Sequence, residues 1–233
     1  MAEFINTIDV LGDEAVMDSI INRTITEFKD DVLTSGGAYA FSKCTALLTV
    51  DLPNLTTMQA SMFDGCSNLS TLNLPKFKKV SGGEYLFNLP KLENINCPSL
   101  VGTPNWSFRG CAFEKIVLPA MTDHGTWSFN DNSKLKIADF SVLKSMNATS
   151  WRNNTSLIAL VLRNSTVVTM MDSSALTNSP IATGAGYIYV PRVLVDSYEA
   201  AANWSTYAAQ FRALEDYTID GTITGELDET KIQ

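Results

Sequence analysis

The sequence is poor in the residues that most enzymatic and metal sites require. It has a single histidine, His124, and four cysteines without a Cys-x-x-Cys pair. That set supports neither a zinc site nor thioredoxin-type redox chemistry. No Gly-x-Ser-x-Gly motif or similar setting surrounds a serine, so a hydrolase nucleophile cannot be named. We therefore expect no catalytic residue, no metal ligand and no cofactor; a hydrolase on this scaffold is kept only as a formal alternative.

Positive charge is also scarce. The 17 Lys and Arg against 25 Asp and Glu leave a formal net charge of -8. The grooves that bind nucleic acid and the surfaces that bind anionic membranes both need clustered Lys and Arg. The one short basic cluster, Lys76, Lys78 and Lys79, is typical of a solvated surface. We expect no nucleic-acid partner.

Long apolar runs are missing as well. No window approaches the roughly 18 consecutive apolar residues of a membrane span, so we expect no membrane insertion. The opening "MAEFINTIDVLGDE" lacks the basic and apolar regions of a secretory signal. We expect a chain that does not use the general secretory route, and four reduced thiols fit folding in cytosol.

Internal repetition, in contrast, is abundant. The stretch "FDGCSNLSTLNLP" from Phe63 returns as "FSKCTALLTVDLP" from Phe41 and, with decay, as "LFNLPKLENINCP" from Leu86. The copy from Phe108 has lost one residue in its middle, and further copies begin at Phe129 and Trp151. The step stays between 21 and 23 residues, which is the mark of a repeat architecture.

Each unit carries the pattern of one short strand. The sixth, ninth and eleventh residues after the Phe are apolar, as in Leu47, Val50 and Leu52, and the last two flank a polar residue. A proline then ends the strand in four units. Because one unit cannot bury its own apolar side, we expect stacked coils whose strands pair in parallel. The predicted ladder runs through Val50, Leu72, Ile95 and Leu160.

These units resemble the BspA-type leucine-rich repeat, whose pattern runs roughly L-x-x-L-x-LP, a variable turn, then AF-x-x-C-x-x-L. The match covers about residues 33 to 162. The departures are Leu89, Asn132 and Asn154 in place of the Cys, and Ser141 and Arg163 in place of the Pro. The resemblance implies an α/β-type repeat solenoid, a right-handed coil with a parallel β-sheet along one face. It also implies a binding or adhesive role more often than an enzymatic one.

Three of the cysteines share one position in their units. Cys44, Cys66 and Cys111 each follow the Phe by three residues, so stacking would place them in a column. Such a column could be a metal or disulfide ladder. The Leu and Asn replacements in other units favour structural packing, in a slot that needs a small or turn-bonding side chain. Cys97 occupies an inward strand position as a small hydrophobe.

The two ends differ from the repeats. We expect residues 1–32 to form an N-terminal segment with a helical cap over Asp13–Thr24, and 33–186 to form the solenoid of about six units. Residues 1–12 could instead dock onto a larger assembly. We expect 187–233 to form a C-terminal strand-helix cap and acidic tail. The predicted strand of this cap covers Tyr187–Val190, and the predicted helix runs from about Arg192 to Ala202. The apolar side of the helix would consist of Val193, Val195 and Tyr198, and Trp204 would anchor the turn after it.

The outward strand residues form the candidate surfaces. The early half is polar and suits hydrogen bonds with a glycan or protein; its residues are Thr49, Asp51, Thr71, Asn73, Asn94 and Asn96. The later half is apolar, and it is either an assembly contact or is packed under the C-terminal block; its residues are Val117, Ile137, Ala159 and Val161. Three aromatic residues near the Phe position either stack on sugar rings or are structural; these are Tyr39, Trp106 and Trp127.

These features favour a non-enzymatic binding protein. The terminal block resembles the ending seen after such repeats in proteins of gut bacteria and their phages. Our leading hypothesis is a phage virion component, in a tail or head fibre, that displays an adhesive repeat domain. Its partners would be a bacterial surface glycan or protein and other virion structural proteins, and multiple copies would gain avidity, for which a homo-oligomer is one route. The alternative is a bacterial interaction module in the cytoplasm or on the cell surface.

Overall fold

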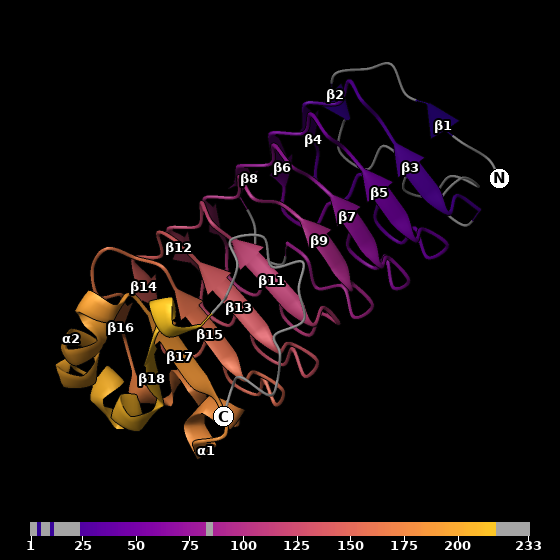
Figure 1. Cartoon of the computed structure of the whole chain (residues 1–233). Helices are drawn as coiled ribbons and strands as arrows, with labels where there is room; N and C mark the ends of the chain where they lie inside the picture. Colours follow the sequence, from indigo (N-terminus) through magenta and orange to yellow (C-terminus); the bar gives the residue numbers. More distant parts are fainter. Residues whose placement is uncertain (1–3, 6–9, 12–23, 83–85, 218–233) are drawn as a thin grey trace.

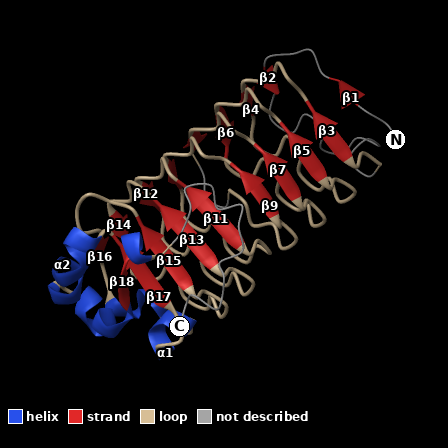
Figure 2. Ribbon diagram, in the orientation of Figure 1, coloured by secondary structure: helices blue, strands red, loops and turns tan. Residues whose placement is uncertain are grey.

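The computed structural model shows an elongated solenoid in which each coil adds a strand beside the preceding one (Figure 1). The structure describes residues 4–5, 10–11, 24–82 and 86–217. The strands stand in a row along the molecule, and the helices gather at its C-terminal end (Figure 2). The predicted α/β repeat solenoid with a parallel sheet along one face is confirmed.

The main face carries two five-stranded parallel sheets. The first consists of β1 (Phe4–Ile5), β3 (Glu27–Lys29), β5 (Thr49–Asp51), β7 (Thr71–Asn73) and β9 (Asn94–Asn96). The second consists of β11 (Lys115–Leu118), β13 (Ile137–Phe140), β15 (Ala159–Leu162), β17 (Tyr187–Val190) and β18 (Phe211–Ala213). Strand pairing therefore extends beyond residues 33–186 on both sides, since β3 pairs with β5 and β17 with β15.

A second row of short strands, which the sequence pattern did not reveal, runs along another side of the solenoid. The strands of one sheet are β2 (Val10–Leu11), β4 (Ser35–Gly36), β6 (Thr57–Gln59) and β8 (Lys79–Ser81). Two further pairs are β10 (Gly102–Thr103) with β12 (Asp123–His124), and β14 (Ser145–Met146) with β16 (Thr169–Met170). These strands have two or three residues each.

Helical segments occur at the C-terminal end of the described residues. They are the α-helices α1 (Pro180–Thr183) and α2 (Val195–Ala200), with 3-10 helices at Ser173–Leu176, Arg192–Leu194, Trp204–Gln210 and Leu214–Asp216. The predicted strand Tyr187–Val190 is confirmed. The single helix predicted from Arg192 to Ala202 is a 3-10 turn followed by the short α2, and Val193 is 85% exposed rather than on its apolar side. Tyr198 and Trp204 are fully buried.

Two predicted end features lie outside the described residues. Apart from Thr24, the helical cap expected over Asp13–Thr24 falls within residues 12–23, and the acidic tail falls on residues 218–233. The docking alternative for residues 1–12 stays a prediction, since strand pairing of β1 and β2 is all that is described there.

A column of aromatic side chains fills the core, and its members occupy equivalent turns of successive coils. Rings stack at 5.5 Å between Phe41 and Phe63 and at 4.4 Å between Phe129 and Trp151. In the third unit the column residue is Phe87 and not Leu86, because the Phe87 N–H donates to the next coil as the Phe41 N–H does. The full column is Phe41, Phe63, Phe87, Phe108, Phe129 and Trp151. These stacks hold neighbouring coils in register.

The predicted ladder is interrupted in the middle of the molecule. Val50, Leu72 and Ile95 pair in the first sheet, whereas Leu160 pairs with Ala138 and Ile188 in the second. No strand pairing joins β9 to β11 in the described part of the chain. A single ladder through all four predicted residues is therefore wrong.

The cause lies in the lengths of the units. In the unit from Phe108 one residue is missing between Cys111 and Phe113. Before other strands the backbone donates at equivalent positions, Glu93 N–H to Ser70 O and Lys136 N–H to Glu114 O. At the interrupted junction Ala112 N–H donates to Leu92 O instead. The coils thus meet out of register, and β9 and β11 cannot form a regular parallel pair.

Candidate partner-binding surface

The outward face of the first sheet carries a chain of hydrogen-bonded polar side chains. The Asn73 side-chain amide donates to Asp51 Oδ1 at 2.7 Å, and the Asn96 amide donates to Asn73 Oδ1 at 2.7 Å. Lys29 Nζ lies 3.5 Å from Asp51 Oδ2 at the other end. The pairing register places these residues opposite one another. We call this row the amide ladder: Asp51, Asn73 and Asn96.

A second polar row runs beside the amide ladder. Thr49, Thr71 and Asn94 face each other in register, with Thr49 and Thr71 half-buried and Asn94 exposed. The structure thus brings all six residues of the predicted polar surface onto one face. Because the amide ladder fixes its side chains, they present donors and acceptors in set positions.

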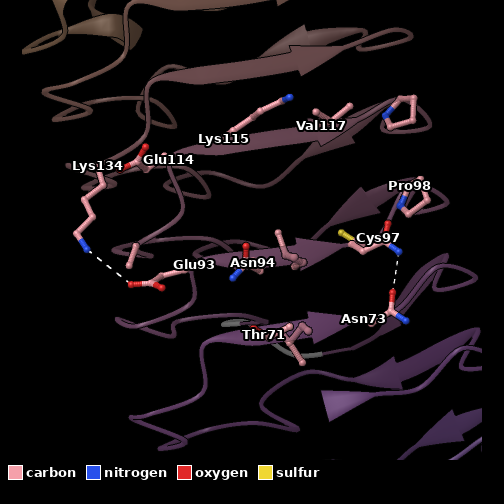
Figure 3. Close-up of a pocket in the computed structure, with 15 residues that line it drawn as sticks. Thr71, Asn73, Glu93, Asn94, Cys97, Pro98, Glu114, Lys115, Val117 and Lys134 are labelled. Carbon is pink, nitrogen blue, oxygen red and sulfur yellow. Dashed lines mark hydrogen bonds and ion pairs between the residues drawn. The ribbon is translucent and has the colours of Figure 1, made fainter. Parts of the chain in front are cut away.

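A groove of about 910 Å³ lies where this face meets the second sheet (Figure 3). One wall comes from β7 and β9, including Thr71, Asn73, Asn94 and Asn96; the other comes from β11 and its flanks, including Glu114, Lys115 and Val117. Lys134 Nζ lies 3.9 Å from Glu93 Oε1 at one end. The groove coincides with the interrupted strand pairing, so the register change creates it.

The outward face of the second sheet is covered by the chain itself. Ile137, Ala159 and Val161 form a buried cluster with Tyr189, against which Tyr187, Leu214 and Tyr217 pack. Packing under the C-terminal block is therefore the arrangement found, and these three residues cannot form the proposed assembly contact. Val117 differs, since it is 42% exposed and lines the groove.

The predicted aromatic surface is only partly assembled. Trp106 and Trp127 stack with centroids 5.2 Å apart and planes 5° from parallel, and the Arg109 guanidinium lies 5.0 Å from the Trp106 ring centroid. Tyr39 is 42% exposed and is separated from the pair by intervening coils, with Ser61 at the equivalent position of the next coil. The two indoles cover each other, which reduces the ring surface left for a sugar.

The cysteine positions are structural. Cys66 Sγ donates to Phe41 O and Cys111 Sγ donates to Phe87 O, each at 3.0 Å. Asn132 Oδ1 accepts from Cys111 N–H at 2.7 Å, and its amide donates to Phe129 O. Burial raises the pKa of the Cys97 and Cys111 thiols to about 12. The interpretation of this slot as one for small or turn-bonding side chains is confirmed.

His124 belongs to the core rather than to an exposed turn. It ends strand β12 and is buried, with its ring edge-on to Phe129 and Trp151. Within the described residues no group of three or more His, Cys, Asp or Glu is arranged to hold a metal ion. No helix in that same part of the chain has the length and apolar character needed to cross a bilayer.

Sequence reasoning missed the groove and its charged rim. Glu93, Glu114 and Lys134 carry no sequence signal because each is an exposed charged residue that belongs to no motif. Arg163 was noted only as a replacement for proline, yet it forms a two-pronged ion pair with buried Asp139. The sequence signal that could have indicated the groove is the missing residue in the unit from Phe108, because a change in the length of one repeat unit shifts the register of its strand.

A stacked parallel solenoid with a hydrogen-bonded polar face defines a repeat scaffold for binding. The family model of the BspA type leucine rich repeat region matches residues 10–136 and 81–185 in six copies, so this chain belongs to that family. Repeat domains of this family generally act in protein or surface binding and are typically non-enzymatic. No curated protein matches the sequence.

Solved structures with a similar fold come from several bacteria. A leucine rich repeat protein of T. pallidum has a TM-score of 0.59 and 16% identity, over 81% of this chain and 85% of that one. A leucine rich cell surface protein of Faecalibacterium prausnitzii has a TM-score of 0.46 and 14% identity. This chain is covered to 78% in that match but spans only 64% of the Faecalibacterium protein. At 16% identity the likeness to the T. pallidum protein shows the fold alone.

Proposed function

We propose that this chain is a non-enzymatic adhesive module that contacts its partner through the polar face of β5, β7 and β9. The observation that carries the proposal is the contrast between the two sheets. The first presents the amide ladder on its outer face, whereas the second has its outer face covered by Tyr187, Leu214 and Tyr217. Pre-positioned amide, hydroxyl and carboxyl groups suit a bacterial surface glycan or protein.

The test uses two matched threonine variants and intact bacterial cells or envelope fragments. Thr49 lies on the polar face in β5, and Thr57 lies in β6 on the second row; both are half-buried. Thr49→Arg is expected to weaken binding at least about tenfold, equivalent to about 1.4 kcal/mol. Thr57→Arg should bind as the unsubstituted chain does. Equal binding by both variants contradicts this choice of face.

A second proposal concerns the carrier of the module, that is, the particle or cell to which the chain belongs. We propose a phage tail or head-fibre component, with a bacterial cell-surface or cytoplasmic protein as the alternative. The sequence resemblance of the terminal block supports the first, and family membership is compatible with both. Proteomics of purified virions separates them: stoichiometric recovery of the chain supports the virion, and its absence from particles overturns it.

Display of several copies would strengthen binding on a virion and on a bacterial cell alike. A single polar face of this kind gives weak binding, and several copies on one particle or cell raise the effective concentration. Other virion proteins or a homo-oligomer would supply these copies. Mass photometry of the purified chain tests the homo-oligomer, because a strictly monomeric distribution contradicts it. The Trp106–Trp127 pair is kept as an additional sugar contact within this proposal.

A further inference from the structure

Three unusual features meet at the interrupted junction, and the first concerns the core. The middle residue of each main strand points inward, and Val50, Leu72 and Ile116 are at most 2% exposed. Ile95 is the equivalent residue of β9, yet it is only partly buried and lines the groove. The apolar core is therefore open to the groove at this coil. Such an opening offers an apolar floor beneath polar walls, which is the usual composition of a ligand site.

The second feature is a backbone donor. In the first sheet the residue after each of the strands β3, β5 and β7 donates to the next coil, as Leu52 N–H does to Asn73 O and Leu74 N–H to Asn96 O. Cys97 is the equivalent residue after β9, and its N–H has no such bond among the described residues. Cys97 is 2% exposed and lines the groove. Buried backbone N–H groups without an acceptor are rare, so this donor indicates a missing acceptor.

The third feature is the end of the amide ladder. Within the ladder, Asn73 donates its side-chain amide to Asp51 in the preceding coil and accepts from Asn96 in the next coil. Asn96 donates to Asn73 in this way, but the corresponding position of the next unit is Val117, which has no donor. Asn96 Oδ1 thus reaches the groove wall as an acceptor. Donor, acceptor and apolar floor lie within one groove.

We propose that this groove binds an extended peptide segment of a partner protein, which pairs with the open edge of β9. Main-chain carbonyl and N–H groups of such a segment would meet Cys97 N–H and Asn96 Oδ1, and one aliphatic side chain would rest on Ile95. An unpaired strand edge is a template for another strand, and alternate side chains then enter pockets. Among the described residues no aromatic side chain lines the groove, so they supply no stacking platform of the kind that a sugar ring prefers.

This inference rests on the proposed binding function and narrows it to one partner chemistry. The test begins with a displayed library of short random peptides selected on the full chain. Val117→Trp fills the groove, and Val142→Trp is the matched control, because Val142 is 45% exposed and does not line the groove. Asn96→Trp closes the groove from the β9 side, in case Val117→Trp perturbs folding. Circular dichroism establishes that each variant keeps the fold.

The expected result is enrichment of peptides that bind the unsubstituted chain and Val142→Trp equally, and bind both groove variants at least about tenfold more weakly. Failure to enrich any peptide sensitive to the groove variants overturns the proposal. The proposal is also overturned if Val117→Trp weakens binding to glycans on an array but weakens binding to no peptide. The proposed adhesive function is tested separately by cell binding. If cells are bound, and Val117→Trp changes neither this binding nor that of any peptide, the adhesive function stands and the peptide groove fails.

Discussion

The indole N–H of Trp151 donates to Nε2 of His124 across 3.3 Å, inside the core. The other ring nitrogen, Nδ1, lies 3.1 Å from Gly125 O. With Nε2 as acceptor, Nδ1 carries the only ring proton and donates to Gly125 O, so the contact with Trp151 requires the neutral ring. Burial lowers the pKa of His124 from 6.5 to about 4. One ionisable side chain is therefore fixed in its uncharged form by the packing of neighbouring coils.

Stability should depend on pH because of His124. The unfolded chain binds a proton at this site below about pH 6.5, whereas the folded chain does so only near pH 4. The contribution is complete above pH 6.5, declines as the pH falls and levels off below about pH 4, for a total of roughly 3 kcal/mol. Denaturant unfolding from pH 7 to pH 4 measures it. His124→Gln keeps an acceptor without titrating, so an unchanged pH slope in that variant would refute the assignment.

The ion pair of Arg163 with Asp139 should be essential for stability. Arg163 Nε lies 2.9 Å from Asp139 Oδ1 and its Nη2 2.9 Å from Oδ2, and the Asp139 side chain is only 4% exposed. Arg163→Met leaves that carboxylate buried without its cation, which is expected to cost about 3–5 kcal/mol. Lys136→Met is the control. It breaks an exposed pair with Glu114, so a loss of at most about 1 kcal/mol is expected in the same unfolding assay.

The four thiols should be inert in the native protein. All four are buried, and desolvation holds the pKa of Cys97 and Cys111 near 12, so almost no thiolate forms at neutral pH. A colorimetric thiol reagent is expected to react with none of them in buffer and with all four in guanidinium chloride. Rapid reaction of Cys44, Cys66 or Cys111 in the native state contradicts the packed column.

Turn geometry predicts a stabilising substitution. The second residue after the aromatic column adopts positive φ in several coils, with Gly65 at 73° and Asn153 at 63°. Lys43 occupies the same position at 59°, where a side chain with Cβ is strained. Lys43→Gly should raise the free energy of unfolding by up to about 1 kcal/mol, and Gly65→Ala should lower it by a similar amount. Thermal unfolding of the two variants checks both signs.

The repeat period and strand pattern were sufficient to predict the stacked fold, the inward Val50 and Leu72 and the packed cysteines, because these depend on local spacing alone. The covering of Ile137 and Val161 was not decided by the sequence, since contact between sheet and C-terminal block joins residues far apart in the chain. The groove escaped prediction for a similar reason. A missing residue near Cys111 is visible in the sequence, but its effect on strand pairing depends on how two coils meet.

The most direct measurement of the central relationship is amide hydrogen exchange at the junction of β9 and β11. Cys97 and Leu74 occupy equivalent positions, but Leu74 N–H donates to Asn96 O at 2.7 Å while Cys97 N–H has no such bond among the described residues. We predict that the Cys97 amide exchanges at least about a hundredfold faster than the Leu74 amide, which corresponds to about 2.7 kcal/mol. Equal protection of the two amides would show a continuous sheet and contradict the open groove.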